Sequence, residues 1–252
     1  MRKSARTVIT ASALLSVLSA CATSVSEINA DRRGYLLSAF APENISSGVV
    51  TEIKKDDVKS KSFREMEIRV QTDYDDSAQI THPLISTTYI DAGHGMVQQL
   101  SVVSRNTIPY MLWYSLTYRG IMPLKFQNVP LKASRTPLPS ITKKIVRLPM
   151  GLATARDDTE YKFKYTVGRE TQIADFWNFE ITCKFTRRYA ANSLHRNLSG
   201  DALDLLCEYS KDGVLDRKTK YVFLQQYGFA VLLDDIGVTY KLNGTITDVE
   251  IR

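Results

Sequence analysis

Residues 160–167 read Glu-Tyr-Lys-Phe-Lys-Tyr-Thr-Val, so every second side chain is apolar or aromatic. Side chains of an extended strand point alternately to its two faces, and this stretch therefore predicts a strand with one buried and one solvated face. The same alternation recurs at Met66, Ile68 and Val70, which lie between charged neighbours. Period-two spacing is far more frequent in the chain than helical spacing, which predicts an all-β fold.

Turn residues between these runs favour antiparallel pairing. Lys211-Asp212-Gly213 separates two strand-like runs, and Asn243-Gly244 lies between two further runs. Asn-Gly is the strongest short-range hairpin signal, because both central residues of a type I′ turn need positive φ. We therefore predict antiparallel sheets, sandwich-like, in one or two β-rich halves with little helix. The spacing of apolar residues in 189–198 predicts one or two helical turns there.

Prolines mark a possible internal boundary. Five of the eight lie between Pro123 and Pro149, and the stretch 130–139 cannot donate a continuous ladder of hydrogen bonds. The chain then divides into an N-terminal β-rich half (46–127), a proline-rich connection (128–150) and a C-terminal β-rich half (151–252). Two interpretations of the connection remain open: a crossover within one β fold, or an extended arm that docks a partner.

The N-terminus has the layout of an export signal. Three basic residues, Arg2, Lys3 and Arg6, precede an apolar stretch at 8–18 that is too short to span a bilayer. The stretch ends in Leu-Ser-Ala-Cys at residues 18–21, a tetrad that resembles the lipobox of bacterial lipoproteins. An ordinary secretory signal is the alternative, because Ala20-Cys21-Ala22 also fits a small-x-small cleavage site.

The resemblance to bacterial lipoproteins implies a signal peptide at 1–20, a lipid on Cys21, and a lipidated N-terminus and tether at 21–45. It also implies, through Ala22 in place of Asp, retention in the outer membrane. We therefore expect a lipid-anchored protein of the bacterial outer membrane that faces the periplasm. Its partners would be the membrane, through the anchor, and another envelope protein.

Two cysteines remain once Cys21 is assigned to lipid. Cys183 and Cys207 each lie on the apolar face of a strand-like run, and an exported protein reaches an oxidising compartment. We expect them to form a disulfide. The alternative is two unpaired buried cysteines that act as small apolar residues.

Composition and motifs restrict the chemistry. The net charge is +6, of which the signal peptide supplies three, so the mature chain carries +3 and gives no reason to expect a nucleic acid partner. The sequence lacks the common hydrolase, nucleotide, dinucleotide and zinc motifs, and we predict no catalytic residue, metal or cofactor. Asp91 and His94 in a glycine-flanked loop, and the acidic stretch 73–77, are best interpreted as turns.

Three classes of function are compatible with these features. The first is a binding or scaffolding module for other envelope components, which sheet edges and the proline-rich stretch would serve. The second is a lipid-anchored hydrolase acting on envelope polymer or peptide, with Asp91 and His94 as its candidate residues. The third is a carrier of a small apolar ligand. The sequence favours the first, and a non-enzymatic role.

Overall fold

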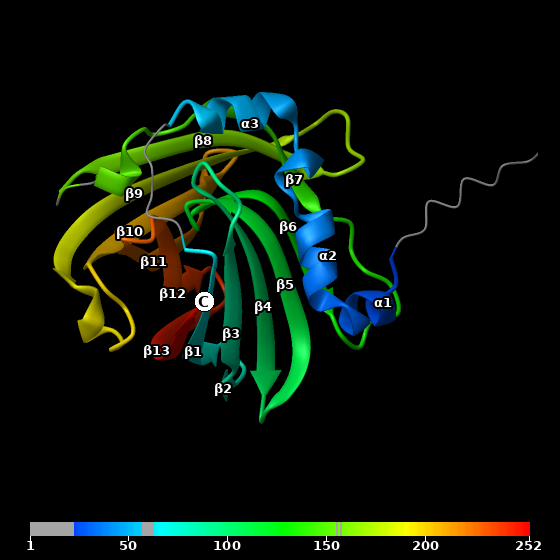
Figure 1. The fold of residues 1–252 in the computed structure, drawn as a ribbon. Helices are drawn as coiled ribbons and strands as arrows, with labels where there is room; N and C mark the ends of the chain where they lie inside the picture. The colour runs from blue at the N-terminus through cyan, green and yellow to red at the C-terminus, as the bar shows by residue number, and fades with distance from the viewer. Residues whose placement is uncertain (1–22, 57–62, 155, 157) are drawn as a thin grey trace, which may run out of the picture.

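The computed structural model describes residues 23–56, 63–154, 156 and 158–252. These residues form one antiparallel sheet whose long strands close into a barrel of twelve strands (Figure 1). Short helices lie along one side of the barrel and across its top. The all-β class, the antiparallel pairing and the low helix content agree with the sequence prediction.

The strands follow one another round the barrel almost entirely in chain order, and the two-residue β2 pairs with β1 alone. Their bounds are β1 (Glu65–Asp75), β2 (Ile80–Thr81), β3 (Leu84–Asp91), β4 (Met96–Arg105), β5 (Ile108–Tyr118), β6 (Met122–Pro130), β7 (Ser140–Arg147), β8 (Glu160–Arg169), β9 (Trp177–Ala190), β10 (Asp201–Lys211), β11 (Val214–Leu224), β12 (Phe229–Gly237) and β13 (Lys241–Ile251).

The first and last long strands pair with each other. β13 runs beside β1 from Met66 opposite Ile251 to Asp75 opposite Lys241, and this ladder closes the sheet. The predicted sandwich-like arrangement is therefore wrong. Alternation defines the buried face of each strand but does not determine whether the two ends of a sheet meet. Strand pairing within the barrel is short at two places. Only two residue pairs form between β6 and β7, and only two between β12 and β13.

The two predicted hairpin turns have different outcomes. Asp212 and Gly213 form the turn between β10 and β11, with φ of 49° and 83°. Asn243 and Gly244 instead lie inside β13, so that prediction is wrong. A Cβ on Gly244 would come within 2.6 Å of Val70 Cγ1 and 2.9 Å of the Leu233 carbonyl oxygen. This glycine is needed for close packing against neighbouring strands rather than for a turn.

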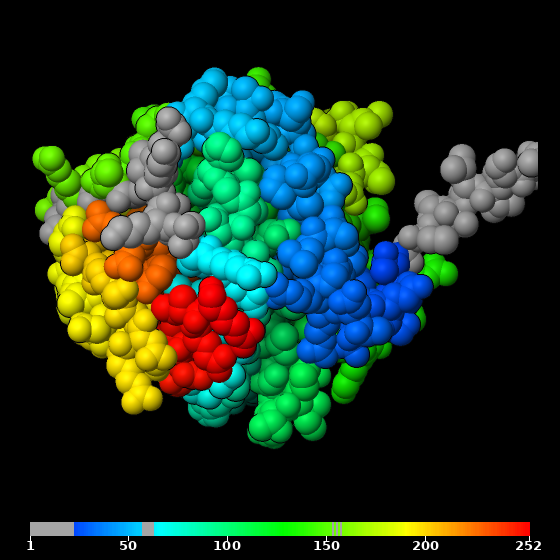
Figure 2. Space-filling view, in the orientation of Figure 1, coloured from blue at the N-terminus to red at the C-terminus, as the bar shows by residue number. Residues whose placement is uncertain are grey.

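The N-terminal segment is packed helix where a tether was expected. It forms α1 (Val25–Ala30), α2 (Arg32–Ala39), the 3-10 turn η1 (Pro42–Asn44) and α3 (Ser47–Lys54). Ser24 and Glu27 form a capping box that starts α1. Figure 2 shows this blue segment spread over the front of the molecule. Because α1 and α2 are short, tertiary burial of their apolar side chains, rather than helix propensity, holds them in place.

The proline-rich stretch links two neighbouring strands of the one sheet. β6 ends at Pro130 and β7 begins at Ser140, so both halves of the chain belong to the same barrel. Leu131 and Ala133 are partly buried and pack against the core. The expected helical turns at 189–198 are reduced to η3 (Ala191–Ser193), because β9 continues to Ala190; the remaining 3-10 turn is η2 (Leu152–Thr154).

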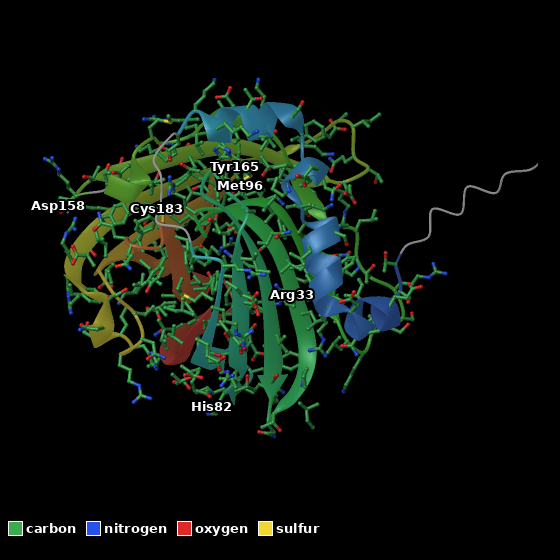
Figure 3. All side chains as sticks on the ribbon, viewed as in Figure 1. Arg33, His82, Met96, Asp158, Tyr165 and Cys183 are labelled. Carbon is green, nitrogen blue, oxygen red and sulfur yellow. A yellow bond between two sulfur atoms is a disulfide. The ribbon has the colours of Figure 1, made fainter. Side chains whose placement is uncertain are left out.

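The largest apolar cluster joins the helices to the strands. Ile28 of α1, Phe40 after α2 and Ile53 of α3 are buried in it with side chains of β4–β12. The cluster also holds Cys183 and Cys207, which face each other on β9 and β10 and form a disulfide. Cys183 is labelled on β9 in Figure 3. The bond agrees with the expected pairing.

Candidate functional site

A pocket of about 410 Å³ lies where α2, β6, the proline-rich connection and the turn after β8 meet. Pockets of this size, roughly 300–1,000 Å³, are typical of small-molecule and cofactor sites. Its lining combines aliphatic, aromatic and charged groups: Thr23, Tyr35, Ala39, Asn44, Lys125, Gln127, Thr136, Pro137, Leu138, Pro139 and Glu170.

A buried ammonium group forms the polar floor of the pocket. The Lys125 side chain is only 4% exposed, and its Nζ lies 2.6 Å from Glu170 Oε1. The same nitrogen lies 5.5 Å from the centre of the Phe40 ring, within range of a cation–π interaction. Burying an unpaired charge is costly, so these partners are needed to keep the Lys125 ammonium group away from solvent. The half-exposed Glu170 therefore holds the Lys125 side chain in place in the pocket.

Gln127 ties two walls of the pocket together. Its Oε1 accepts a hydrogen bond from the Tyr35 hydroxyl of α2 at 2.7 Å, and its Nε2 donates to the Pro137 carbonyl at 2.7 Å. Burial raises the pKa of Tyr35, although the bond to Gln127 lowers it. Tyr35 is therefore a neutral donor at physiological pH. The amide fixes α2 and the connection at a defined separation.

The start of the described chain lies at the rim of this pocket. Ser24 forms an isolated antiparallel bridge with Arg135, and the Thr136 hydroxyl donates to the Thr23 carbonyl at 3.1 Å. The proline-rich connection thus binds the chain's own N-terminal segment. Cys21 and the signal peptide at 1–20 lie outside the described residues.

The acidic and histidine residues noted in the sequence form turns. Asp91 Oδ1 accepts from the Gly93 amide at 2.9 Å, and His94 is exposed with φ of 53° in the β3–β4 turn. Asp75 and Asp76 cap amides of the tight turn after β1. Within the described ranges, no group of three His, Cys, Asp or Glu side chains could hold a metal ion. Neither stretch has the geometry of a catalytic site.

The sequence did not identify Lys125, Gln127 or Tyr35. Lys125 and Gln127 alternate with the exposed Phe126 and Asn128 on β6, so their polar side chains resemble a solvated face. They are buried because α2 and the connection cover that face, with contacts as distant in sequence as 92 residues. Only knowledge of the tertiary packing reveals them.

A second buried polar cluster closes one end of the barrel. Arg119, with φ of 52°, lies in the β5–β6 turn and donates from Nη2 to Asp56 Oδ2 at 3.0 Å and from Nη1 to the Gly228 carbonyl at 3.2 Å. The Tyr118 hydroxyl also bonds to Asp56. The Gly151 amide completes the cluster through Asp56 Oδ1. It joins four segments that are distant in sequence through buried bonds, which assigns it a structural role.

Comparisons with known proteins give a distant likeness of fold. No family model and no curated protein matches the chain. A β-barrel-like protein of unknown function from Brucella abortus superposes with a TM-score of 0.39 at 8% identity, covering 76% of this chain and 100% of that one. A hypothetical lipoprotein from Escherichia coli gives 0.37 at 9% identity, covering 81% and 97%. At these values the likeness establishes neither a shared family nor a shared function.

No helix in the described part of the chain is long and apolar enough to span a bilayer.

Proposed function

We propose that the protein is a lipid-anchored binding module of the bacterial outer membrane, facing the periplasm, and that it binds another envelope component in the pocket beside Gln127. One observation carries this proposal: the segment that directly follows the expected lipid on Cys21 is fixed at the rim of the pocket. Two residues span at most about 7 Å. A lipid on Cys21 would therefore hold the pocket close to the membrane rather than at the end of a long tether.

The chemistry of the pocket favours binding over catalysis. Its polar groups are an ion pair, two amides, a neutral phenol and two threonine hydroxyls. A hydroxyl nucleophile needs an adjacent base; the lining holds no histidine, and its one carboxylate, Glu170, is paired with Lys125. Barrel closure also removes the free sheet edges that were expected to bind a partner. β1 and β13 pair with each other and are not free to add a partner's strand. Partner contact is then expected at the pocket.

The test is site-specific photocrosslinking in intact cells. A photoreactive residue in place of Asn44, which is exposed at the pocket rim, should trap a discrete envelope component. The matched control is Asn192, which is exposed in η3 directly after β9. The yellow end of β9 lies far from α1 in Figure 1. Equal products from both positions, or none from Asn44, would contradict the proposed site. Loss of fatty-acid labelling in Cys21→Ser separately tests the anchor.

A carrier of a small ligand is the second candidate, and the pocket volume of about 410 Å³ favours it. The buried Lys125 would suit the acidic group of an amphipathic molecule, with the proline and leucine side chains against its apolar part. Native mass spectrometry of the extracted protein distinguishes the carrier from the binding module. A bound small molecule that is lost in Lys125→Met would favour the carrier, whereas a crosslinked protein would favour the binding module.

A further inference from the structure

The middle of the chain has a pronounced charge bias. Residues 92–156 contain no Asp or Glu, although acidic residues are frequent on both sides of this range. The same range holds nine basic residues: Arg105, Arg119, Lys125, Lys132, Arg135, Lys143, Lys144, Arg147 and Arg156. Arg119 and Lys125 are buried side chains that form the ion pairs described above. The others are available to form a positive surface.

Four of these basic residues gather in one surface segment. Lys132 and Arg135 lie in the proline-rich connection, and Lys144 and Arg147 lie on β7 directly after it. All four are exposed, and none forms an ion pair with a residue that the structure describes. We call residues 131–150 the basic stripe.

Exposed apolar side chains alternate with these charges. Leu138, Val146 and Met150 belong to the basic stripe and are between 47% and 61% exposed. Ile173, 92% exposed, lies in the turn after β8, which is tied to the stripe by bonds from Glu170 to Pro139 and from Lys143 to Glu170. A surface that mixes basic and apolar side chains fits the interface of an anionic membrane, where the charges meet headgroups and the apolar groups enter the acyl boundary.

The proline-rich end of the basic stripe lies on the side of the molecule where the N-terminus arrives. The bridge between Ser24 and Arg135 and the bond between Thr136 and Thr23 join the two directly. Figure 1 draws the green connection between β6 and β7 beside α1, far from the yellow end of β9. A lipid on Cys21 would thus enter the bilayer within about 7 Å of Thr23.

We propose that the basic stripe lies flat on a membrane surface of anionic phospholipids and orients the barrel on it. The proposal deepens the function proposed above and rests on the lipid at Cys21. Each Lys or Arg near an anionic surface favours contact roughly fivefold. Several such residues next to the anchor suffice to select one orientation among the many that an anchored domain could sample. The pocket between α2 and the connection would then open beside the headgroups.

The test is the position of a fluorophore relative to the bilayer in the acylated, full-length mature protein. A single cysteine at Leu138 or, as control, at Asn192 carries an environment-sensitive label; Cys183 and Cys207 are bonded and do not compete. The protein is reconstituted into vesicles of phosphatidylethanolamine and phosphatidylglycerol that contain a headgroup-linked quencher. We expect strong quenching at Leu138 and little at Asn192. A stripe variant, Lys132→Gln with Arg135→Gln and Lys144→Gln, should reduce the Leu138 signal to the Asn192 level.

A matched variant controls for charge alone. Lys162→Gln with Lys184→Gln and Lys218→Gln removes three basic residues that lie outside the basic stripe, and it should leave the Leu138 signal unchanged. Flotation of each variant with the vesicles reports the anchor separately. Absence of flotation would refute the lipid anchor and hence the function proposed above. Flotation with equal quenching at both positions, or quenching that persists in the stripe variant, would overturn the orientation and leave a soluble polyanion as the ligand of the stripe.

Discussion

Asp56 and Arg119 form an ion pair that is almost completely removed from solvent. Arg119 Nη2 lies 3.0 Å from Asp56 Oδ2, and the two side chains are 0% and 1% exposed. The pair joins the segment after α3 to the β5–β6 turn, while the remaining bonds of its members reach Gly228 and Gly151. Removing one partner of such a pair leaves the other charge buried without compensation.

Asp56→Ala should therefore lower the free energy of unfolding by about 3 kcal/mol, at the low end of the range for broken buried pairs, since Arg119 keeps its bond to the Gly228 carbonyl. The measurement is the midpoint of urea unfolding at an unchanged slope. Glu208→Ala is the control, because its ion pair with Lys218 is exposed and should contribute little. Equal midpoints for the two variants would show that the buried pair is not needed.

Buried tyrosines predict loss of the fold at alkaline pH. Burial is the main reason that the pKa values of Tyr165 and Tyr209 are raised above the ordinary value of 10.0. The folded state then holds the phenolic protons more tightly than the unfolded state. Their contribution to stability is complete below pH 10 and is lost as the pH rises above it. Circular dichroism followed through this range should show cooperative unfolding.

Tyr165→Phe tests the assignment, because it removes one ionisable group and keeps the ring. The alkaline midpoint should move to higher pH, with little change of stability at neutral pH. A midpoint that stays in place, or tyrosine ionisation that is complete while the fold persists, would contradict the argument. Tyr209 is a poorer site for this test, because its hydroxyl also bonds to the Ile121 carbonyl and to Tyr221.

The disulfide gives a third prediction. Cys183 and Cys207 are 24 residues apart, and closing a loop of that length should stabilise the fold by about 3 kcal/mol in the chain-entropy description. Alkylation of the unfolded, unreduced mature protein should find neither thiol free. Reduction should then expose both and lower the urea midpoint. A thiol that reacts before reduction would refute the bond.

Local patterns in the sequence were informative where a local cause decides the structure. The alternation at 160–167 predicts β8, and Asp212-Gly213 predicts the turn after β10, because side-chain direction and positive φ depend on neighbouring residues. Gly244 shows the limit of such patterns. The reason for this glycine is the approach of Val70 and Leu233, which are distant in sequence.

The barrel and the pocket depend on contacts that no local pattern contains. Closure requires β1 to meet β13, and the pocket requires α2 to reach Gln127 across the sheet. The segment expected to be a tether became helical for the same reason: Val25, Ile28 and Leu36 find apolar partners on the strands. A short helix gains most of its stability from such packing, which a window of sequence does not reveal.

The last prediction contrasts the pocket with the loop that the sequence singled out. Gln127→Ala should lower the free energy of unfolding by about 2 kcal/mol, because the Tyr35 hydroxyl and the Pro137 carbonyl both lose their partner in a partly buried setting. It should also speed protease cleavage within 130–139 and reduce crosslinking from Asn44. Asn128→Ala is the matched control, since this neighbour is exposed on the other face of β6.

Variants of the β3–β4 turn should leave the same measurements unchanged. His94→Gly suits the φ of 53° at that position, and Asp91→Asn keeps an oxygen to accept from the Gly93 amide. If His94→Gly removed the crosslink from Asn44 while Gln127→Ala kept both the crosslink and protease resistance, the binding site would lie at the turn. The pocket would then be a packing defect beneath the connection, and the hydrolase hypothesis would regain its candidate residues.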